Sequence, residues 1–164
     1  MKTILLALTL SLCAVLPVSA TQSPELKIRA AEATIRGLPT EHAIIFNSAG
    51  DIVARFDAGT ADDVRISING FAGDIMTHNH TLNVSFSTAD VDNAREMGLS
   101  QLRVVEPDGV TCTLTATADH PFVMMWLTDD YPHTIDSIGA EDFNWDGVWR
   151  HYAALYGLSY GCSR

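Results

Sequence analysis

Two pairs of short apolar runs, each joined by a turn, most constrain how this chain can fold. They lie at residues 42–46 with 52–56, around the turn 48–51, and at residues 102–106 with 110–117, around the turn 107–109. Runs rich in β-branched and aromatic residues that flank a glycine-containing turn are typical of β-hairpins. A buried strand at residues 74–78 and a shorter strand at residues 64–68 are expected beside them. The chain is therefore predicted to contain a β-sheet.

Three further segments carry apolar residues at helical spacing. They span residues 24–38, ending at Gly37 and Pro39, residues 88–97, ending at Gly98, and residues 145–155, ending at Gly157. Ser87 is suited to be the N-cap of the second helix, with Asp90 three residues later in the capping-box position. We therefore predict a single α/β (α+β) domain, in which a mixed β-sheet is flanked by helices.

The first twenty residues have the features of a cleavable signal peptide. Lys2 precedes an apolar run over residues 4–18, and small residues follow up to Ala20, where a signal peptidase would cut. The apolar run is shorter than the roughly 20 residues that cross a bilayer core, which disfavours a membrane anchor. We expect residues 1–20 to be removed on export and residues 21–164 to form the mature domain, in the periplasm or outside the cell.

The net charge excludes some kinds of partner, and the cysteines indicate a compartment in which disulfides form. The net charge is −10, which argues against nucleic acid or an anionic membrane as a partner. Cys13 would leave with the signal peptide, so Cys112 and Cys162 remain as an even pair in a compartment that permits oxidation. A disulfide between them is expected, because the alternative of a cysteine metal site lacks any CxxC-type pair. Nothing in the sequence indicates the oligomeric state.

The residues that carry chemistry lie between positions 77 and 90. His78 and His80 are two apart, so both imidazoles project from one side of an extended chain, and Asp90 follows in the first turn of the next helix. Two imidazoles and one carboxylate suit Zn²⁺ and leave a fourth tetrahedral position for water. A nearby carboxylate is then needed to shuttle a proton, and Glu41 is the candidate because it begins a strand that can lie alongside. The other interpretation is structural, with Ser87 and Asp90 as an ordinary helix cap and the histidines as polar residues near a strand end.

These residues resemble the JAMM (MPN+) zinc metalloprotease family, with its RadC-like bacterial and phage relatives. The family pattern is an upstream glutamate, His-x-His-Pro, a short loop and Ser-x-x-Asp; this chain has Glu41, then His78-Asn79-His80, then Ser87-Thr88-Ala89-Asp90. The resemblance covers about residues 41–114 and implies a JAMM/cytidine-deaminase-like fold. It also implies that His78, His80 and Asp90 hold zinc, that Glu41 is the general acid/base, and that Ser87 donates to the oxyanion.

Two features depart from the family pattern and leave two functions open. Thr81 stands where the family has proline, and the loop from His80 to Asp90 is shorter than usual. The first function is a secreted or periplasmic zinc-dependent hydrolase that cleaves an amide, peptide or isopeptide bond, cell-wall peptides included, through a metal-activated water. The second is a catalytically inactive binding or partner-recognition module on the same fold. The sequence does not distinguish the substrates, and it assigns no role to residues 120–146.

Overall fold

The computed structural model describes residues 22–57, 59–61, 63–66, 70–117, 119–120, 122 and 145–164. These residues form a mixed six-stranded sheet with three helices, which confirms the predicted class of a single α/β domain. The strands in chain order are β1 (Ala43–Phe46), β2 (Ile52–Phe56), β3 (Ile75–Asn79), β4 (Gln101–Val105), β5 (Thr111–Thr115) and β6 (Ser159–Ser163). The helices are α1 (Pro24–Ile35), α2 (Thr88–Met97) and α4 (Trp145–Tyr156).

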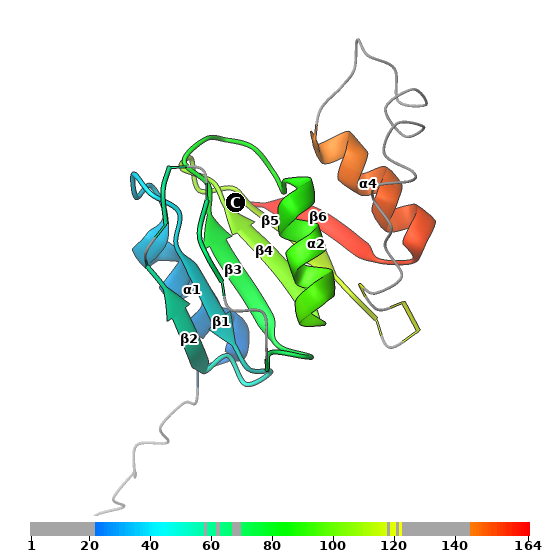
Figure 1. Ribbon diagram of the computed structural model, residues 1–164, viewed down its shortest axis with the longest axis horizontal. Coiled ribbons are helices and arrows are strands. Elements are labelled where there is room, and N and C mark those ends of the chain that lie inside the picture. The colour runs from blue at the N-terminus through cyan, green and yellow to red at the C-terminus, as the bar shows by residue number, and fades with distance from the viewer. Residues whose placement is uncertain are drawn as a thin grey trace, which may run out of the picture.

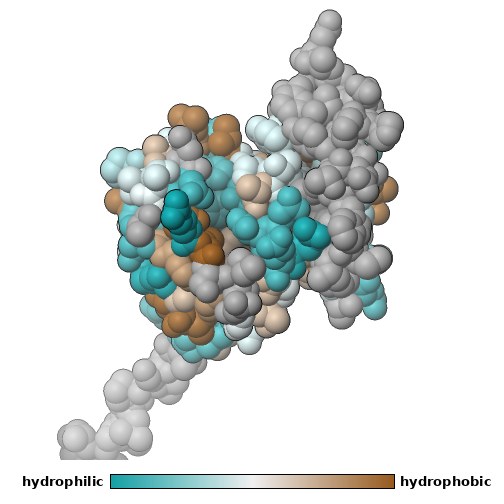
Figure 2. All heavy atoms as spheres, in the orientation of Figure 1, coloured by the Kyte–Doolittle hydropathy of each residue, from teal (hydrophilic) through white to brown (hydrophobic). Residues whose placement is uncertain are grey.

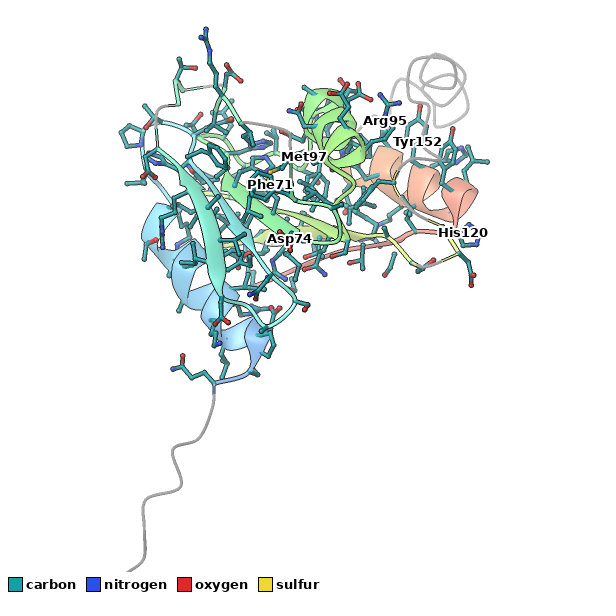
Figure 3. All side chains as sticks on the ribbon, turned by 60° about the horizontal axis from the view of Figure 1, so that its bottom comes forward. Phe71, Asp74, Arg95, Met97, His120 and Tyr152 are labelled. Carbon is teal, nitrogen blue, oxygen red and sulfur yellow. A yellow bond between two sulfur atoms is a disulfide. The ribbon has the colours of Figure 1, made fainter. Side chains whose placement is uncertain are left out.

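Helices cover both faces of the sheet (Figure 1). The face under α1 is the smaller core, in which Ile28 and Ile35 of the helix pack with Ile44 and Phe46 of β1. The opposite face carries the larger core, to which both α2 and α4 contribute. Met97 and Tyr152 extend from these two helices into that core (Figure 3) and are 3% and 0% exposed. The outer side of α2 is largely hydrophilic (Figure 2), so each helix buries one apolar stripe.

The strand order β2-β1-β3-β4-β5-β6 contains one parallel pair within the described sheet, β3 with β4. Helix α2 makes the connection between these two strands, and the remaining neighbours are antiparallel. Parallel neighbours end at the same edge of a sheet, and in open α/β sheets ligands bind outside the carboxyl ends of such strands. His80 and Glu106 are the first residues after β3 and β4, so both lie at this edge.

A buried charge network holds α1 to the sheet. Arg103 of β4 is 4% exposed, and its guanidinium donates to both carboxylate oxygens of Glu32, at 2.6 and 3.2 Å. It also donates to both oxygens of Glu25, at 3.1 Å each. Thr77 of β3 donates its hydroxyl hydrogen to Glu32 at 3.0 Å. Because charges so far from water are costly unless paired, this network fixes how α1 lies on the sheet.

The two predicted hairpins are confirmed as β1–β2 and β4–β5. The strand predicted at residues 64–68 is wrong over its described part, residues 64–66, which form no strand. Both edges of β1 are already paired, with β2 and β3, and Val64 and Ile66 instead pack their side chains against the larger core. The first helix ends at Ile35 rather than Leu38, because the backbone of Arg36 leaves the helical conformation, with ψ of 130°.

The expected disulfide is present between Cys112 and Cys162. It joins two residues that face each other in the β5–β6 ladder. Strand β6 itself was not predicted from the sequence. Among the described residues, no helix is long and apolar enough to cross a membrane. The expected signal peptide, residues 1–20, lies outside the described residues, as does most of the segment 120–146.

Candidate metal centre

The structure brings the two histidines together at the carboxyl end of β3. His78 is the fourth residue of the strand and His80 follows its last residue, so their side chains fall on the same side, toward α2. Their Nε2 atoms are 3.1 Å apart, and the residues are 1% and 6% exposed. Two buried imidazoles with ring nitrogens this close need a cation between them or a hydrogen bond from one ring to the other.

The tautomer of His80 is set by the loop that follows it. Nδ1 of His80 lies 2.9 Å from the carbonyl oxygen of Val84. A carbonyl can only accept, so Nδ1 carries the hydrogen and the neutral ring presents a lone pair at Nε2. Nδ1 of His78 is buried and has no hydrogen-bond partner among the described residues. Of the two rings, only that of His80 therefore has its tautomer fixed by a hydrogen bond at Nδ1, which leaves a lone pair on the Nε2 that faces the cluster.

Asp90 reaches the histidines from the first turn of α2. Ser87 and Asp90 form the predicted capping box: the Ser87 N–H and hydroxyl both donate to Asp90 Oδ2 at 2.7 Å, and the Asp90 N–H donates to Ser87 Oγ at 3.2 Å. Oδ1 lies 3.3 Å from His78 Nε2, and Oδ2 lies 3.4 Å from His80 Nε2. The cap thus uses Oδ2 as its acceptor, so Oδ1 is the oxygen with more capacity left to bind an ion. The first turn of the helix holds Oδ1 beside His78.

The electrostatics of the cluster favour a positive charge at its centre. Burial acts to raise the pKa of Asp90, but the charges and hydrogen bonds of His78 and His80 outweigh it and hold that pKa well below its usual value. Burial likewise acts to lower the pKa of His80. The hydrogen bond and charge of Asp90, the Val84 carbonyl and the charge of Glu41 together raise it. A carboxylate that stays ionised between two imidazoles attracts a proton or a metal ion.

The cluster has the composition and close spacing of a metal site. Zinc–nitrogen and zinc–oxygen bonds of about 2.0–2.2 Å at tetrahedral angles place neighbouring ligand atoms about 3.3–3.5 Å apart. The two Nε2 atoms are 3.1 Å apart, Asp90 Oδ1 is 3.3 Å from His78 Nε2, and the other oxygen, Oδ2, is 3.4 Å from His80 Nε2; one ligand atom from each residue lies within 4.8 Å of the others. These residues could therefore hold a metal ion. Two imidazoles and a carboxylate accept several first-row divalent ions, zinc among them.

Glu41 lies beside this cluster because of the pairing between β1 and β3. The antiparallel register places Ala43 opposite His78, so Glu41, two residues earlier, comes opposite His80. Its Oε1 is 3.9 Å from His80 Nε2, and the residue is 9% exposed. His42, between them, is turned elsewhere: its ring nitrogens contact Asp57 and Thr40.

The backbone of Glu41 is held by the segment that follows β2. Its N–H donates to the carbonyl of Thr60 at 2.7 Å. Gly59 comes so close that a Cβ placed there would lie 1.9 Å from the carbonyl oxygen of Glu41. The absence of a side chain at Gly59 is thus what allows this segment to lie against the site.

A cavity of about 220 Å³ opens over the cluster. Glu41, His78, His80, Ser87 and Asp90 all line it, so the structure brings together every residue predicted for the site. Apolar side chains complete its wall, and these were not predicted from the sequence: Val64, Ile66, Met76, Leu82, Val84 and Ala89. The cavity therefore combines a charged floor with apolar sides, as many ligand sites do.

The loop after His80 is held to a neighbouring segment by the side chain of Thr81. Thr81 donates its hydroxyl hydrogen to the carbonyl of Ala61 at 2.9 Å. Leu82 and Val84 are 64% and 38% exposed on the same loop, at the rim of the cavity. Thr81 thus anchors the loop to the neighbouring segment through a hydrogen bond that proline could not make.

The remaining histidines of the described chain lie away from the cluster. His120 packs its ring against Gly157, just past the end of α4, in agreement with its position in Figure 3. His151 is exposed and touches the ring of Tyr152. Within the described residues, one group of side chains has metal-ligand composition and spacing, the cluster of His78, His80 and Asp90.

Comparison with known proteins adds no identification. No family model matches the chain, and searches of curated proteins and of solved structures find no significant match.

Proposed function

We propose that the protein is a zinc-dependent hydrolase of the JAMM type that cleaves an amide, peptide or isopeptide bond outside the cytoplasm. The observation that supports this most is the convergence of His78, His80 and Asp90 with a fourth residue, the acidic Glu41, from the segment that leads into β1. A helix cap alone explains Asp90, but it does not explain why two buried imidazoles and a second carboxylate face it.

Each residue has a role that its position supports. His78, His80 and Asp90 would hold the ion, which when bound polarises a carbonyl and lowers the pKa of water to about 7. Glu41 Oε1, 3.9 Å from His80 Nε2, would accept a proton within the cavity and return it to the leaving amine. Ser87 would orient Asp90 and, with its hydroxyl turned from Oδ2, donate to the oxyanion. The Val84 carbonyl keeps His80 in the required tautomer.

The cavity wall favours an apolar group next to the scissile bond. Leu82 and Val84 stand exposed at its rim, and Ile66 and Met76 line it further in. A substrate side chain placed there would remove these apolar surfaces from water at about 25 cal/mol per Å². We therefore expect peptides with an aliphatic residue at this position to be better substrates than those with a charged one.

The test is hydrolysis of fluorogenic peptide-amide and isopeptide substrates by the zinc-loaded protein. Glu41→Gln keeps the shape of the side chain and removes its basicity, so turnover should fall about 10²–10⁴-fold with the metal content unchanged. Glu96→Gln, an exposed site on α2, makes the same change in charge elsewhere and should leave turnover unaltered. Equal activity of Glu41→Gln and the unchanged protein would refute the assigned role.

One observation favours the alternative, a catalytically inactive binding module. The Ser87 hydroxyl donates its one hydrogen to Asp90 and accepts from the Asp90 N–H, so in the cap it has no hydrogen left for an oxyanion. A protein that binds zinc stoichiometrically but hydrolyses none of the amide, peptide and isopeptide substrates would support this alternative and overturn the hydrolase.

A further inference from the structure

A second cavity, of about 420 Å³, lies at the same edge of the sheet beside the disulfide. Its walls include Val84, Val110 and Trp145, together with both cysteines of the disulfide. Val84 lines this cavity and the metal-centre cavity, so the loop after His80 separates the two. The volume falls within the range of about 300–1,000 Å³ that small-molecule sites occupy.

The acidic side chain of Glu106 is buried in this cavity without a hydrogen-bond donor from the described residues. The residue is 8% exposed, and Cys112 Sγ lies 3.7 Å from its Oε1. That sulfur belongs to the disulfide and carries no hydrogen, so it cannot donate. Burial raises the pKa of Glu106, Asp108 and Asp146 raise it further, and the nearby charge of His80 opposes them.

A carboxylate that is largely withdrawn from water and faces a cavity is stabilised by a charged donor, and a cationic ligand would supply one. The second acidic group on the wall, Asp146, is already bound to Arg150, whose Nε lies 2.8 Å from Oδ2. Arg150 packs over the ring of Tyr160, 5.6 Å from its centroid, and does not line the cavity. Of the two carboxylates on the wall, Glu106 is therefore the one without an arginine beside it among the described residues.

The other polar groups in the cavity are few and suit a small donor. The Tyr160 hydroxyl is 3.0 Å from Ser85 Oγ. Burial first, and then the charge of Asp146, raises the pKa of Tyr160 to about 12, so the hydroxyl keeps its hydrogen. Trp145 stacks on Trp149 with ring centroids 6.1 Å apart, which holds its indole against the cavity. An ammonium has three donors and a narrow apolar stem, whereas a guanidinium has five donors that would need more acceptors than these.

We propose that this cavity binds a primary alkylammonium group, with the ammonium donating to Glu106 and the alkyl chain lying against Trp145, Val84 and Val110. The site is separate from the metal centre and does not depend on the proposed hydrolysis. Its ligand would be a small amine or an amine-bearing side chain of a larger molecule.

The probe is n-pentylammonium, titrated by calorimetry in the presence of a metal chelator so that the metal centre plays no part. Its neutral counterpart, 1-pentanol, has the same chain length and no charge. We expect saturable binding of the amine and at least tenfold weaker binding of the alcohol, since a charge-assisted hydrogen bond contributes enough for about that factor. Glu106→Gln should weaken amine binding by about the same factor, and Glu96→Gln should not change it.

Three results would each overturn the proposal. The first is equal affinity for the amine and the alcohol, and the second is no saturable amine binding up to about 10 mM. The third is unchanged amine affinity in a Glu106→Gln protein with a normal circular dichroism spectrum. The comparison of amine with alcohol uses the unchanged protein, so it decides the question even if the variant fails to fold.

Discussion

Removal of the disulfide between Cys112 and Cys162 should cost the protein about 4 kcal/mol of its free energy of unfolding. The two cysteines are 50 residues apart in the chain. For a loop of that length, the chain-entropy model gives a loss of about 14 cal/mol/K in the unfolded ensemble, or about 4 kcal/mol at 25 °C. The two residues face each other in the β5–β6 ladder. In this model the stabilisation arises because the bond restricts the unfolded chain.

The assay is urea unfolding at pH 7 of the oxidised protein and of the double variant Cys112→Ala/Cys162→Ala. With a slope of about 2 kcal/mol/M, the expected loss moves the midpoint down by about 2 M. Cys112 is 1% exposed, so truncation adds a cavity cost of about 1 kcal/mol. Reductant should destabilise the unchanged protein and leave the double variant unaffected. A total loss below about 1 kcal/mol would refute the reasoning.

Three other perturbations test the charge network, the support of the site and its protonation. Arg103→Met leaves the acidic groups of α1 without their partner and should destabilise the fold by about 3–5 kcal/mol in urea unfolding; a loss under about 1 kcal/mol would contradict the network's role. Gly59→Ala forces a Cβ against the Glu41 carbonyl and should cost about 1–3 kcal/mol, whereas Gly161→Ala, with open space around it, should cost less than half as much. Because the pKa of His80 is raised in the metal-free protein, zinc must displace a proton at any pH below that value. Competition titrations should therefore show affinity falling about tenfold per pH unit on acidification, and a flat profile from pH 7 to 5 would exclude His80 as a ligand.

The parts of the site that depend on local sequence could be predicted. The capping box of Ser87 and Asp90 is formed by residues three apart, and glycine at the αL position ends α2 at Gly98. The common side of His78 and His80 follows from the two-residue period of a strand. These features need no knowledge of the rest of the fold.

The parts that depend on tertiary pairing could not be derived in the same way. Glu41 was placed at the start of a strand, but its position opposite His80 follows from the β1–β3 register, which no local pattern specifies. The Val84 carbonyl that orients His80 belongs to an irregular loop, and a backbone acceptor has no sequence signature. Strand β6 reads Ser-Tyr-Gly-Cys-Ser, with little strand propensity, and it forms because β5 pairs with it and the disulfide joins them.

The resemblance to JAMM proteases grouped five residues from two separate parts of the sequence, Glu41, His78, His80, Ser87 and Asp90. The structure adds that all five line one cavity and that three of them, His78, His80 and Asp90, lie close enough together to hold a metal ion. It also adds an anchor for the loop, the bond from Thr81 to the Ala61 carbonyl, at the position where the family has proline. Zinc as the metal, and hydrolysis as the reaction, are proposals that rest on this arrangement.

Metal analysis of the purified protein tests the central claim most directly. The protein, together with His80→Ala and Asp90→Ala variants, is measured by elemental analysis after dialysis against a metal-free buffer. Glu96→Gln serves as a control for a lost charge outside the site. The account predicts about one zinc per chain in the unchanged protein and the control, and none in the two site variants. No metal above background in the folded unchanged protein, or equal metal in both site variants, would contradict it.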